Sequence, residues 1–412
     1  MSRGIRVALV TSAMRCGGVE TFIVRLGKYL VNAGLDVEVV TTDEPGEWFD
    51  TLFSNGLKGL NIGPTSQTRL GRALEVGRWL AGRRYDVVLL NHARYAQASI
   101  SMLGKDVIVV PVIHNDYDDI YHVACANRRS WNVAVAVSPR VRQVAQARAP
   151  GRPIVNICNG VELPPEDAWR TRTGLNKTVR LVFAGRVAQF QKGADLLPDI
   201  LRACLNLGLD AVLTVLGTGP DLRAIQNKVH QYALAGRVDF RGSVTPAEVY
   251  STLLNSHVLL MPSSFEGLPI TLLEAMACGC VPVASRLPGV TDSVVEDGQS
   301  GVLVKPGSVP DFAAAVAGIS KDPAQWAKMS AKAHERVSRL FSLQTMGLGY
   351  LELIQDSLRG SYPVAWSRRY QLPLDVSLFP LREGLPLGLR VAARNLRTFM
   401  APAFTALGSL RR

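Results

Sequence analysis

Two carboxylates in the second half of the chain have the spacing of a ligand-binding site. Glu266 stands before a helix that we expect to begin at Pro269, and Glu274 lies inside that helix. Carboxylates on both sides of a helix start can accept hydrogen bonds from separate hydroxyl groups, such as those of a nucleotide sugar. The free amides of Gly267 and Leu268 could bind a phosphate or hydroxyl oxygen. The alternative is one capping acid and one surface acid.

Two cations lie at an earlier strand-to-helix turn. Arg186 follows Gly185 directly after a predicted strand, and Lys192 comes six residues later. The fork of an arginine and the point charge of a lysine together suit a diphosphate group. The G-K-[ST] ending of a Walker A loop is missing, so we expect a different kind of phosphate site. Solvated loop charges are the alternative interpretation.

The first half of the chain carries weaker signals. Gly17 and Gly18 follow the first predicted strand and open a helix, where bare backbone can approach an anion. They do not form a G-x-G-x-x-G dinucleotide fingerprint, and a simple tight turn is an equal alternative. His114 ends another strand, where ligands of α/β sheets bind, although a lone histidine is more often structural. Asp116 and Asp118 have D-x-D spacing without a further ligand, so we predict no metal site.

Continuous apolar runs alternate with helix-like segments in both halves, as is typical of parallel strands buried on both faces. This alternation predicts an α/β fold of two Rossmann-like, doubly wound domains. Ligands of such sheets bind beyond the carboxyl ends of the strands, so a cleft between the two facing domains is the expected site. The predicted strands are 5–11, 37–41, 86–91, 107–113, 132–137 and 153–157 in the first domain, and 180–183, 211–216, 238–241, 257–261 and 280–284 in the second.

The domain boundaries follow from a break in this alternation. Polar residues and a proline pair interrupt it at 159–178, which we interpret as the linker. The first domain then spans residues 1–158 and the second spans 179–358. Residues 359–412 form a tail beyond the last predicted helix of the second domain.

The composition bounds the class of protein. Of 412 residues, 47% are hydrophobic and 19% are charged, as in a globular protein. The net charge is +12, and the last 54 residues contribute +7 of it through nine arginines and two acids. A general nucleic-acid binder would carry basic stripes and aromatic platforms on its folded domains, so we expect no nucleic-acid partner. Six scattered cysteines predict reduced core thiols in a cytoplasmic protein.

The tail contains a basic amphipathic pattern at residues 386–412. Its apolar residues recur at helical spacing, while Arg390, Arg394 and Arg397 fall on another face. Such a helix is typical of a membrane surface, where each basic residue contributes about 1 kcal/mol near anionic lipid. We therefore expect peripheral attachment to the inner, cytoplasmic face of a membrane. A tail packed on the first domain or on a partner chain is the alternative.

Together these motifs resemble the family-four retaining glycosyltransferases, which have the two-Rossmann GT-B fold. The resemblance covers about residues 5–358. Its most specific part is the cation pair followed by two glutamates with seven residues between them. It also rests on Gly17-Gly18-Val19-Glu20, Asn159-Gly160-Val161, residues 275–283, Gly298, residues 301–304 and Phe341-Ser342.

The resemblance implies a role for each motif. Arg186 and Lys192 would bind the donor diphosphate and stabilise the charge that develops on the leaving group. Glu274 would bind the ribose hydroxyls, and Glu266 would hold the donor sugar. The remaining contacts would be the amides of Gly267, Leu268 and Pro269 at the sugar, His114 against the sugar from the first domain, and Gly17 and Gly18 near the phosphates and the acceptor.

The resemblance also implies the reaction. A sugar would pass from a UDP- or GDP-linked donor to a glycan or lipid-linked acceptor, in the synthesis of a cell-surface polysaccharide or glycoconjugate. The donor's anomeric configuration would be retained through a same-face displacement without a protein nucleophile. No metal or other cofactor is expected, because cationic side chains and helix ends would do its work. Pro288-Gly289 and Asp292 depart from the family's usual Gly-Gly and Glu, which leaves the donor sugar open.

Two other interpretations stay open from the sequence. One is a nucleotide-sugar epimerase, which would act without an acceptor, or a phosphorylase, which would carry a pyridoxal-phosphate lysine. The other is a non-catalytic, glycosyltransferase-like scaffold that binds through the basic tail. The presence of the two cations and two glutamates favours an enzyme.

Overall fold

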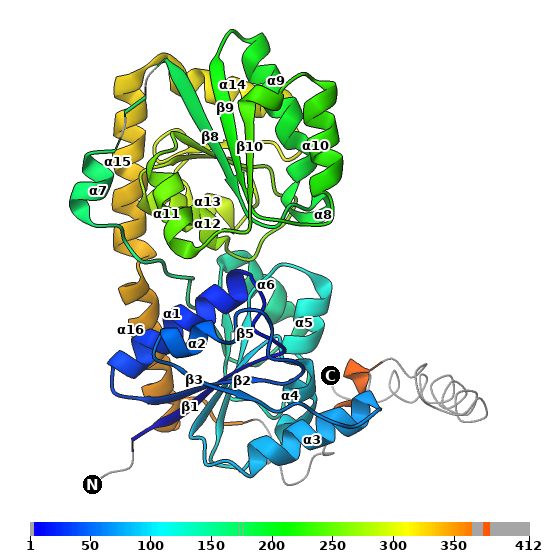
Figure 1. Cartoon of the computed structure of the whole chain (residues 1–412). Coiled ribbons are helices and arrows are strands. Elements are labelled where there is room, and N and C mark those ends of the chain that lie inside the picture. Colours follow the sequence, from blue (N-terminus) through cyan, green and yellow to red (C-terminus); the bar gives the residue numbers. More distant parts are fainter. Residues whose placement is uncertain (1–3, 173, 176, 365–373, 380–412) are drawn as a thin grey trace, which may run out of the picture.

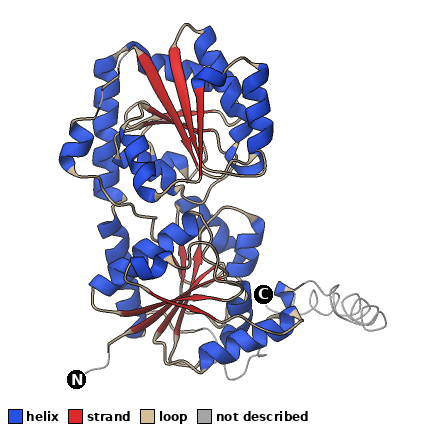
Figure 2. Cartoon of the chain, in the orientation of Figure 1, coloured by secondary structure: helices blue, strands red, loops and turns tan. Residues whose placement is uncertain are grey.

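The computed structural model describes residues 4–172, 174–175, 177–364 and 374–379. It contains two parallel sheets, each flanked by helices, and the two units lie one above the other (Figures 1 and 2). The predicted α/β fold of two doubly wound, Rossmann-like domains is confirmed.

The first sheet has seven strands in the order β3-β2-β1-β4-β5-β6-β7. β1 pairs with both β2 and β4 in parallel, and the strand order changes direction there. The strands are β1 Arg6–Thr11, β2 Asp36–Thr41, β3 Lys58–Asn61, β4 Val87–Asn91, β5 Ile108–Ile113, β6 Ala134–Ala136 and β7 Ile154–Asn156. The helices are α1 Gly18–Asn32, α2 Thr51–Ser54, α3 Arg69–Ala81, α4 Arg94–Ser99, α5 Asp118–Ala124 and α6 Pro139–Arg148, and α7 Glu166–Arg170 lies in the linker.

The second sheet has six strands in the order β10-β9-β8-β11-β12-β13. Its change of direction lies between β8 and β11, which also pair in parallel. The strands are β8 Thr178–Ala184, β9 Asp210–Leu216, β10 Val238–Gly242, β11 Val258–Met261, β12 Val281–Ser285 and β13 Val302–Val304. The helices are α8 Gln189–Lys192, α9 Leu197–Asn206, α10 Leu222–Gln231, α11 Pro246–Leu254, α12 Ile270–Ala277, α13 Thr291–Val294, α14 Val309–Lys321, α15 Pro323–Leu340 and α16 Leu343–Leu358.

Two strands, β3 and β13, were not predicted, and both lie at a sheet edge. β3 has the sequence KGLN and is partly exposed, so it lacks the apolar run of a central strand. β13 is three residues long, which is too short for a clear pattern. The other strands begin and end within two residues of their predicted bounds.

Two segments of the chain cross between the domains side by side. Val161 pairs with Ser342 in an isolated parallel bridge. A Cβ atom on Gly160 would lie 2.6 Å from the Ser342 carbonyl oxygen, so a side chain at residue 160 would collide with the second crossing segment. Beyond the crossing, α16 packs against α1 of the first domain (Figure 1). The sequence alone places this helix in the second domain, whereas the crossing returns it to the first.

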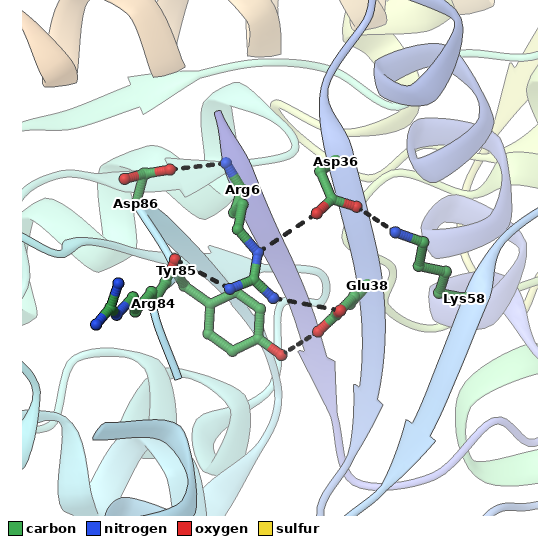
Figure 3. Close-up of polar contacts among 7 residues, drawn as sticks. All are labelled: Arg6, Asp36, Glu38, Lys58, Arg84, Tyr85 and Asp86. Atoms are coloured by element: carbon green, nitrogen blue, oxygen red, sulfur yellow. Dashed lines mark hydrogen bonds and ion pairs between the residues drawn. The ribbon is translucent and has the colours of Figure 1, made fainter. Parts of the chain in front are cut away.

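A polar cluster ties together the amino ends of the first four strands (Figure 3). Arg6 Nε lies 3.4 Å from Asp36 Oδ2, and Arg6 Nη2 lies 3.4 Å from Glu38 Oε1. The Tyr85 hydroxyl donates to Glu38 Oε2 at 2.5 Å, and Lys58 Nζ donates to Asp36 Oδ1 at 2.6 Å. This amino-end cluster consists of Arg6, Asp36, Glu38, Lys58 and Tyr85. It lies at the amino ends of the strands, whereas the predicted site lies at their carboxyl ends.

Residues 374–379 pack against the first domain. Leu378 is buried among side chains of α3, α4 and α5, and Arg94 Nη1 donates to its carbonyl oxygen at 3.1 Å. The basic amphipathic pattern at 386–412 lies outside the described residues. Within the described part of the chain, no helix combines the length and the apolar character needed to cross a bilayer.

The six cysteines all fall within the described residues and are unpaired. Cys204, Cys278 and Cys280 are core residues, and burial raises the pKa of the Cys280 thiol to about 12. Cys16 is exposed, because it belongs to the glycine loop after β1 rather than to a strand. The prediction of core thiols therefore fails for Cys16.

Candidate active site at the facing ends of the two sheets

The loops after β8 and β11 form the second-domain side of the candidate site. These strands are neighbours at the change of direction of the second sheet, where loops diverge and leave space for a ligand. Gly185 and Arg186 follow β8, while Ser263–Glu266 follow β11. The Ser264 amide donates to the Gln191 carbonyl at 2.8 Å, which joins the two loops.

Glu266 and Lys192 are in direct contact between these loops. Lys192 Nζ lies 2.7 Å from Glu266 Oε1. The Ser263 hydroxyl donates to the same oxygen at 2.8 Å, and Gln191 Nε2 donates to Glu266 Oε2 at 3.3 Å. Glu266 is only 5% exposed, so a charged carboxylate there needs these donors. The sequence singled out both charged residues but missed Ser263 and Gln191, which are ordinary loop and helix residues in the sequence.

Arg186 lies at the same edge of the sheet and is exposed. Within the described residues its side chain has neither an ion pair nor a hydrogen bond. Gly185 before it has a φ of 151°, and a Cβ on Gly217 would lie 2.0 Å from the Gly185 carbonyl oxygen. These two loop glycines thus allow close packing behind a guanidinium group whose five donors remain available.

The start of α12 differs by one residue from the prediction. Pro269 is the N-cap, with a φ of −71° and a ψ of 115°, and the helix begins at Ile270. An extended ψ at Pro269 precludes a helical first residue there. Glu266 therefore precedes the helix and Glu274 lies inside it, as the sequence indicated.

The first domain meets this loop at His114. A Cβ on Gly267 would lie 1.9 Å from the His114 carbonyl oxygen, so the two backbones approach as closely as glycine allows. Asn159 Nδ2 donates to the Leu268 carbonyl at 2.9 Å, and the Arg140 amide donates to the Gly289 carbonyl at 3.1 Å. The facing ends of the two sheets are therefore in contact in this structure.

His114 is held in its neutral form. Its Nε2 lies 2.9 Å from Asn91 Oδ1, and its ring lies edge-on to Phe22 with centroids 4.8 Å apart. Burial lowers the pKa of His114 to about 3, and the charge of His92 acts in the same direction. His92 has a φ of 54°, an uncommon conformation that often accompanies a binding site. The sequence did not point to Asn91 or His92, which lie at the end of the neighbouring strand β4.

The paired glycines lie at the same meeting edge. Gly17 is the N-cap of α1, and a Cβ on Gly18 would lie 3.9 Å from Ile270 Cδ1 of α12. Burial raises the pKa of Glu20, in the first turn of α1, to about 7. The glycine loop thus faces the second domain. Beside it lies Glu20, a carboxyl group whose pKa is close to neutral pH.

Glu274 is joined to a residue that the sequence did not single out. Arg25 Nη2 of α1 lies 2.6 Å from Glu274 Oε1 of α12, and the two residues are 6% and 8% exposed. Burial raises the pKa of Glu274, and the guanidinium group opposes that rise. Arg25 was detectable in principle, because it is a charged residue on the apolar side of a predicted helix, between Phe22 and Leu26.

The D-x-D carboxylates are engaged elsewhere. Asp116 accepts from the Tyr121 hydroxyl at 2.7 Å and from Arg140 Nε at 3.0 Å. Asp118 accepts from Arg148 Nη2 at 2.6 Å. These bonds tie α5 and α6 together, so both aspartates have structural partners.

A cavity of about 810 Å³ lies away from all of these residues. It runs between the linker helix α7 and α15, and the rings of Trp169 and His334 stack in its wall with centroids 4.0 Å apart. If cavity volume were the only criterion, the ligand site would be assigned to this cavity. The chemistry favours the facing ends of the sheets, because the cation pair, the two glutamates and His114 lie there.

Two family models match the chain in succession. The model described as Glycosyltransferase Family 4 matches residues 16–163, and the one described as Glycosyl transferases group 1 matches residues 165–336. The chain is a group 1 glycosyltransferase. The loops that carry Arg186, Lys192, Glu266 and Glu274 all lie within the second match.

Curated relatives are identical to this glycosyltransferase at about a quarter of the aligned residues. The phosphatidyl-myo-inositol mannosyltransferase of Mycolicibacterium smegmatis is 28% identical over 346 residues, which cover 78% of this chain and 86% of that protein. The glycogen synthase of Mycobacterium tuberculosis is 27% identical over 209 residues, 50% of this chain and 49% of that protein. The similarity thus extends to mannosyltransferases over most of the chain.

Solved structures confirm the GT-B fold of the glycosyltransferase. Anabaena Alr3699/HepE, in complex with UDP and glucose, has a TM-score of 0.71 at 19% identity and covers 85% of this chain and 100% of its own. S. aureus TarM, in a complex that includes UDP, has a TM-score of 0.72 at 13% identity and covers 85% and 99%. At such identities the likeness establishes the fold alone.

Proposed function

We propose that this glycosyltransferase moves a sugar from a UDP- or GDP-linked donor to a glycan or lipid-linked acceptor, with retention of the anomeric configuration. The observation that carries this proposal is the contact between Lys192 and Glu266 beside the exposed Arg186. Cations for a diphosphate and a carboxylate for sugar hydroxyls then lie at one sheet edge. A nucleotide sugar carries these two kinds of group next to each other.

The roles follow from the donors and acceptors that each residue offers. Arg186 and Lys192 would bind the diphosphate and stabilise the charge that develops as it leaves. Glu266 would accept from sugar hydroxyls once Lys192 turns to the phosphate. Glu274 would accept from the ribose hydroxyls. His114 would act as a neutral contact to the sugar, with Gly17, Gly18, Gly267, Leu268 and Pro269 supplying backbone at the phosphates, the sugar and the acceptor.

The contacts of Glu266 favour a same-face displacement over a retaining route through a covalent intermediate on this residue. Its oxygens already accept from Lys192, Ser263 and Gln191, so it suits hydroxyl binding better than nucleophilic attack on the sugar. In a same-face displacement the bond from the anomeric carbon to the phosphate oxygen breaks as the bond to the acceptor oxygen forms. The acceptor proton passes to the departing phosphate. Cation-assisted departure of the diphosphate is the step that Arg186 and Lys192 would accelerate.

Calorimetric titration with UDP and GDP tests the donor site first. We expect one of the two nucleotides to bind saturably to the full chain and to bind at least tenfold more weakly to Arg186→Ala. Arg223→Ala, which removes an exposed arginine on α10, is the matched control and should bind as the wild type does. If neither nucleotide binds to the folded wild-type chain, the donor proposal fails and the scaffold interpretation gains weight.

Product analysis tests the reaction itself. Proton NMR of the transferred sugar, with the donor that the titration selects, should show the donor's anomeric configuration in the product. Inversion would exclude the same-face displacement. Conversion of the donor sugar without an acceptor would instead favour an epimerase.

We infer that the acceptor is membrane-associated and that the enzyme works at the inner, cytoplasmic face. The support is the arginine-rich pattern at 386–412, which follows residues 374–379 packed on the first domain. Flotation with anionic liposomes should carry the full chain upward but not a chain ended after residue 379. Full-length protein with Arg390, Arg394 and Arg397 replaced by alanine should float less. Equal flotation of all three proteins would refute membrane binding through this segment.

A further inference from the structure

The ion pair between Arg25 and Glu274 links the two domains through their interior. Arg25 comes from α1 of the first domain, and Glu274 comes from α12 of the second. Their atoms Nη2 and Oε1 lie 2.6 Å apart, and both residues are more than nine-tenths buried. Removing two charges from water costs free energy, and a buried ion pair offsets this cost fully only when its other hydrogen-bonding atoms also have partners. The partners of those atoms are therefore worth following.

The pair leaves hydrogen-bonding capacity unused on both partners. Arg25 Nη2 donates to Glu274 and lies 3.3 Å from the Tyr250 hydroxyl. Arg25 Nη1 is buried and has no hydrogen-bond partner among the residues that the structure describes. On Glu274, Oε1 accepts the bond from Arg25, and no donor within the described residues contacts Oε2. A donor group on one partner of the ion pair and an acceptor atom on the other therefore remain unused.

This combination matches a sugar hydroxyl pair. A carboxylate can only accept hydrogen bonds and a guanidinium can only donate them, whereas each hydroxyl does both. A diol that met Glu274 alone would satisfy its donors but not its acceptors. Nη1 supplies the missing donor, and a ligand oxygen there would relieve a buried unsatisfied group.

We propose that Arg25 and Glu274 together form a ribose-diol site to which each domain contributes one residue. This inference rests on the proposed function, in which Glu274 binds the ribose of the donor nucleotide. It adds Arg25 of the first domain to the residues that bind the donor nucleotide. Nucleotide binding then requires the facing ends of the domains to be together, because the diol contacts both.

The test compares nucleotides that differ by one hydroxyl. The full chain, wild type and Arg25→Met, is titrated with whichever of UDP and GDP binds, and with its 2′-deoxy and 3′-deoxy forms. In the wild type we expect removal of the hydroxyl that contacts Nη1 to weaken binding by about tenfold, the effect of a bond to a charged group. In Arg25→Met this discrimination should shrink to less than threefold. Binding of the ribonucleotide should fall accordingly.

Two further variants separate contact from positioning. Arg25→Lys keeps a positive charge beside Glu274 but lacks the second nitrogen, so it should fold and yet lose the discrimination. Tyr250→Phe removes the neighbouring hydroxyl and should retain the discrimination. Thermal melts of each protein confirm that the comparison uses folded chains.

Three results would overturn the inference. Full discrimination in Arg25→Lys would mean that a charge near Glu274 suffices and that Arg25 is a positioning residue. An equal loss for ribo- and deoxynucleotides in Arg25→Met would mean a structural role. Tighter nucleotide binding in Arg25→Met would mean that the arginine competes with the ribose. In each case a preserved effect of Arg186→Ala would leave the proposed function standing.

Discussion

The amino-end cluster lies at one end of the strands of the first sheet, and the facing ends of the two sheets meet at the other end of those strands. In the amino-end cluster each carboxylate accepts from two donors: Arg6 and Lys58 on Asp36, and Arg6 and Tyr85 on Glu38 (Figure 3). At the facing ends the charged groups are only partly satisfied. Arg186 has no side-chain partner in the described chain, and Arg25 Nη1 is buried without one.

The difference in hydrogen-bond satisfaction distinguishes a polar cluster that stabilises the fold from one that can bind a ligand. Structural clusters saturate their hydrogen-bonding capacity, because each unsatisfied buried group costs about 1–3 kcal/mol of stability. A binding site keeps donors and acceptors in reserve for a ligand. Substitutions in the two regions should therefore affect different measurements, activity at the facing ends and stability in the amino-end cluster.

Arg186→Ala should have the largest effect, and it should fall on activity alone. We expect kcat/KM to decrease by about 10²–10³-fold, because the arginine would stabilise charge that develops in the transition state. The exposed side chain makes no hydrogen bond or ion pair within the described residues, so the melting temperature should stay within about 2 °C of the wild type. Initial rates of nucleotide release and a thermal melt measure the two quantities. A large drop in melting temperature would contradict the contrast between the regions.

Glu38→Ala should show the reverse behaviour. Removing this buried carboxylate leaves the Tyr85 hydroxyl without its acceptor and Arg6 with Asp36 as its remaining carboxylate in the cluster, which should lower the free energy of unfolding by about 1–3 kcal/mol. Urea unfolding measures the change. Lys58→Ala, at an exposed ion pair, should cost less than about 1 kcal/mol and is the matched control. Lost activity in folded Glu38→Ala would refute a purely structural role.

Glu20→Gln should change how stability depends on pH. The folded pKa of about 7 lies above the ordinary value of 4.5, so the folded chain holds the proton more tightly than the unfolded chain does. Wild-type stability should then fall as the pH rises from 4.5 to 7, by about 1–2 kcal/mol for a group that is partly exposed. The glutamine variant should lack this fall. Urea unfolding at pH 4.5 and pH 8 makes the comparison, and parallel curves would contradict it.

For His114 we expect the smallest change, because the protonation of its ring should not vary near neutral pH. Its pKa of about 3 lies below the ordinary 6.5, so the ring stays neutral from pH 5 to 8 in the folded chain. Stability linked to His114 is complete above pH 6.5 and declines as the pH falls from 6.5 to 3, where the unfolded chain binds a proton that the folded ring does not. NMR of the labelled ring nitrogens should show no titration between pH 5 and 8. A midpoint near 6.5 would contradict the buried, neutral state.

Much of the fold could be predicted because apolar runs report burial directly. The bounds of the eleven predicted strands agree with the structure within two residues. The sequence did not predict β3 and β13, because an edge strand needs no continuous apolar run. The position of α16 could not be read from its sequence. An apolar helix side does not name the domain that it packs on, and the bridge between Val161 and Ser342 directs α16 to the first domain.

The sequence by itself determined which residues carry charge at the candidate site. Arg186, Lys192, Glu266 and Glu274 stand out because cations and carboxylates in and near strand-to-helix turns offer the donors and acceptors that a diphosphate and sugar hydroxyls need. Only the tertiary structure decided how they pair. Lys192 meets Glu266 because β8 and β11 are neighbours in the sheet. Glu274 meets Arg25, 249 residues away, because the two domains close on each other and bury both charges where only a partner of opposite sign can lie.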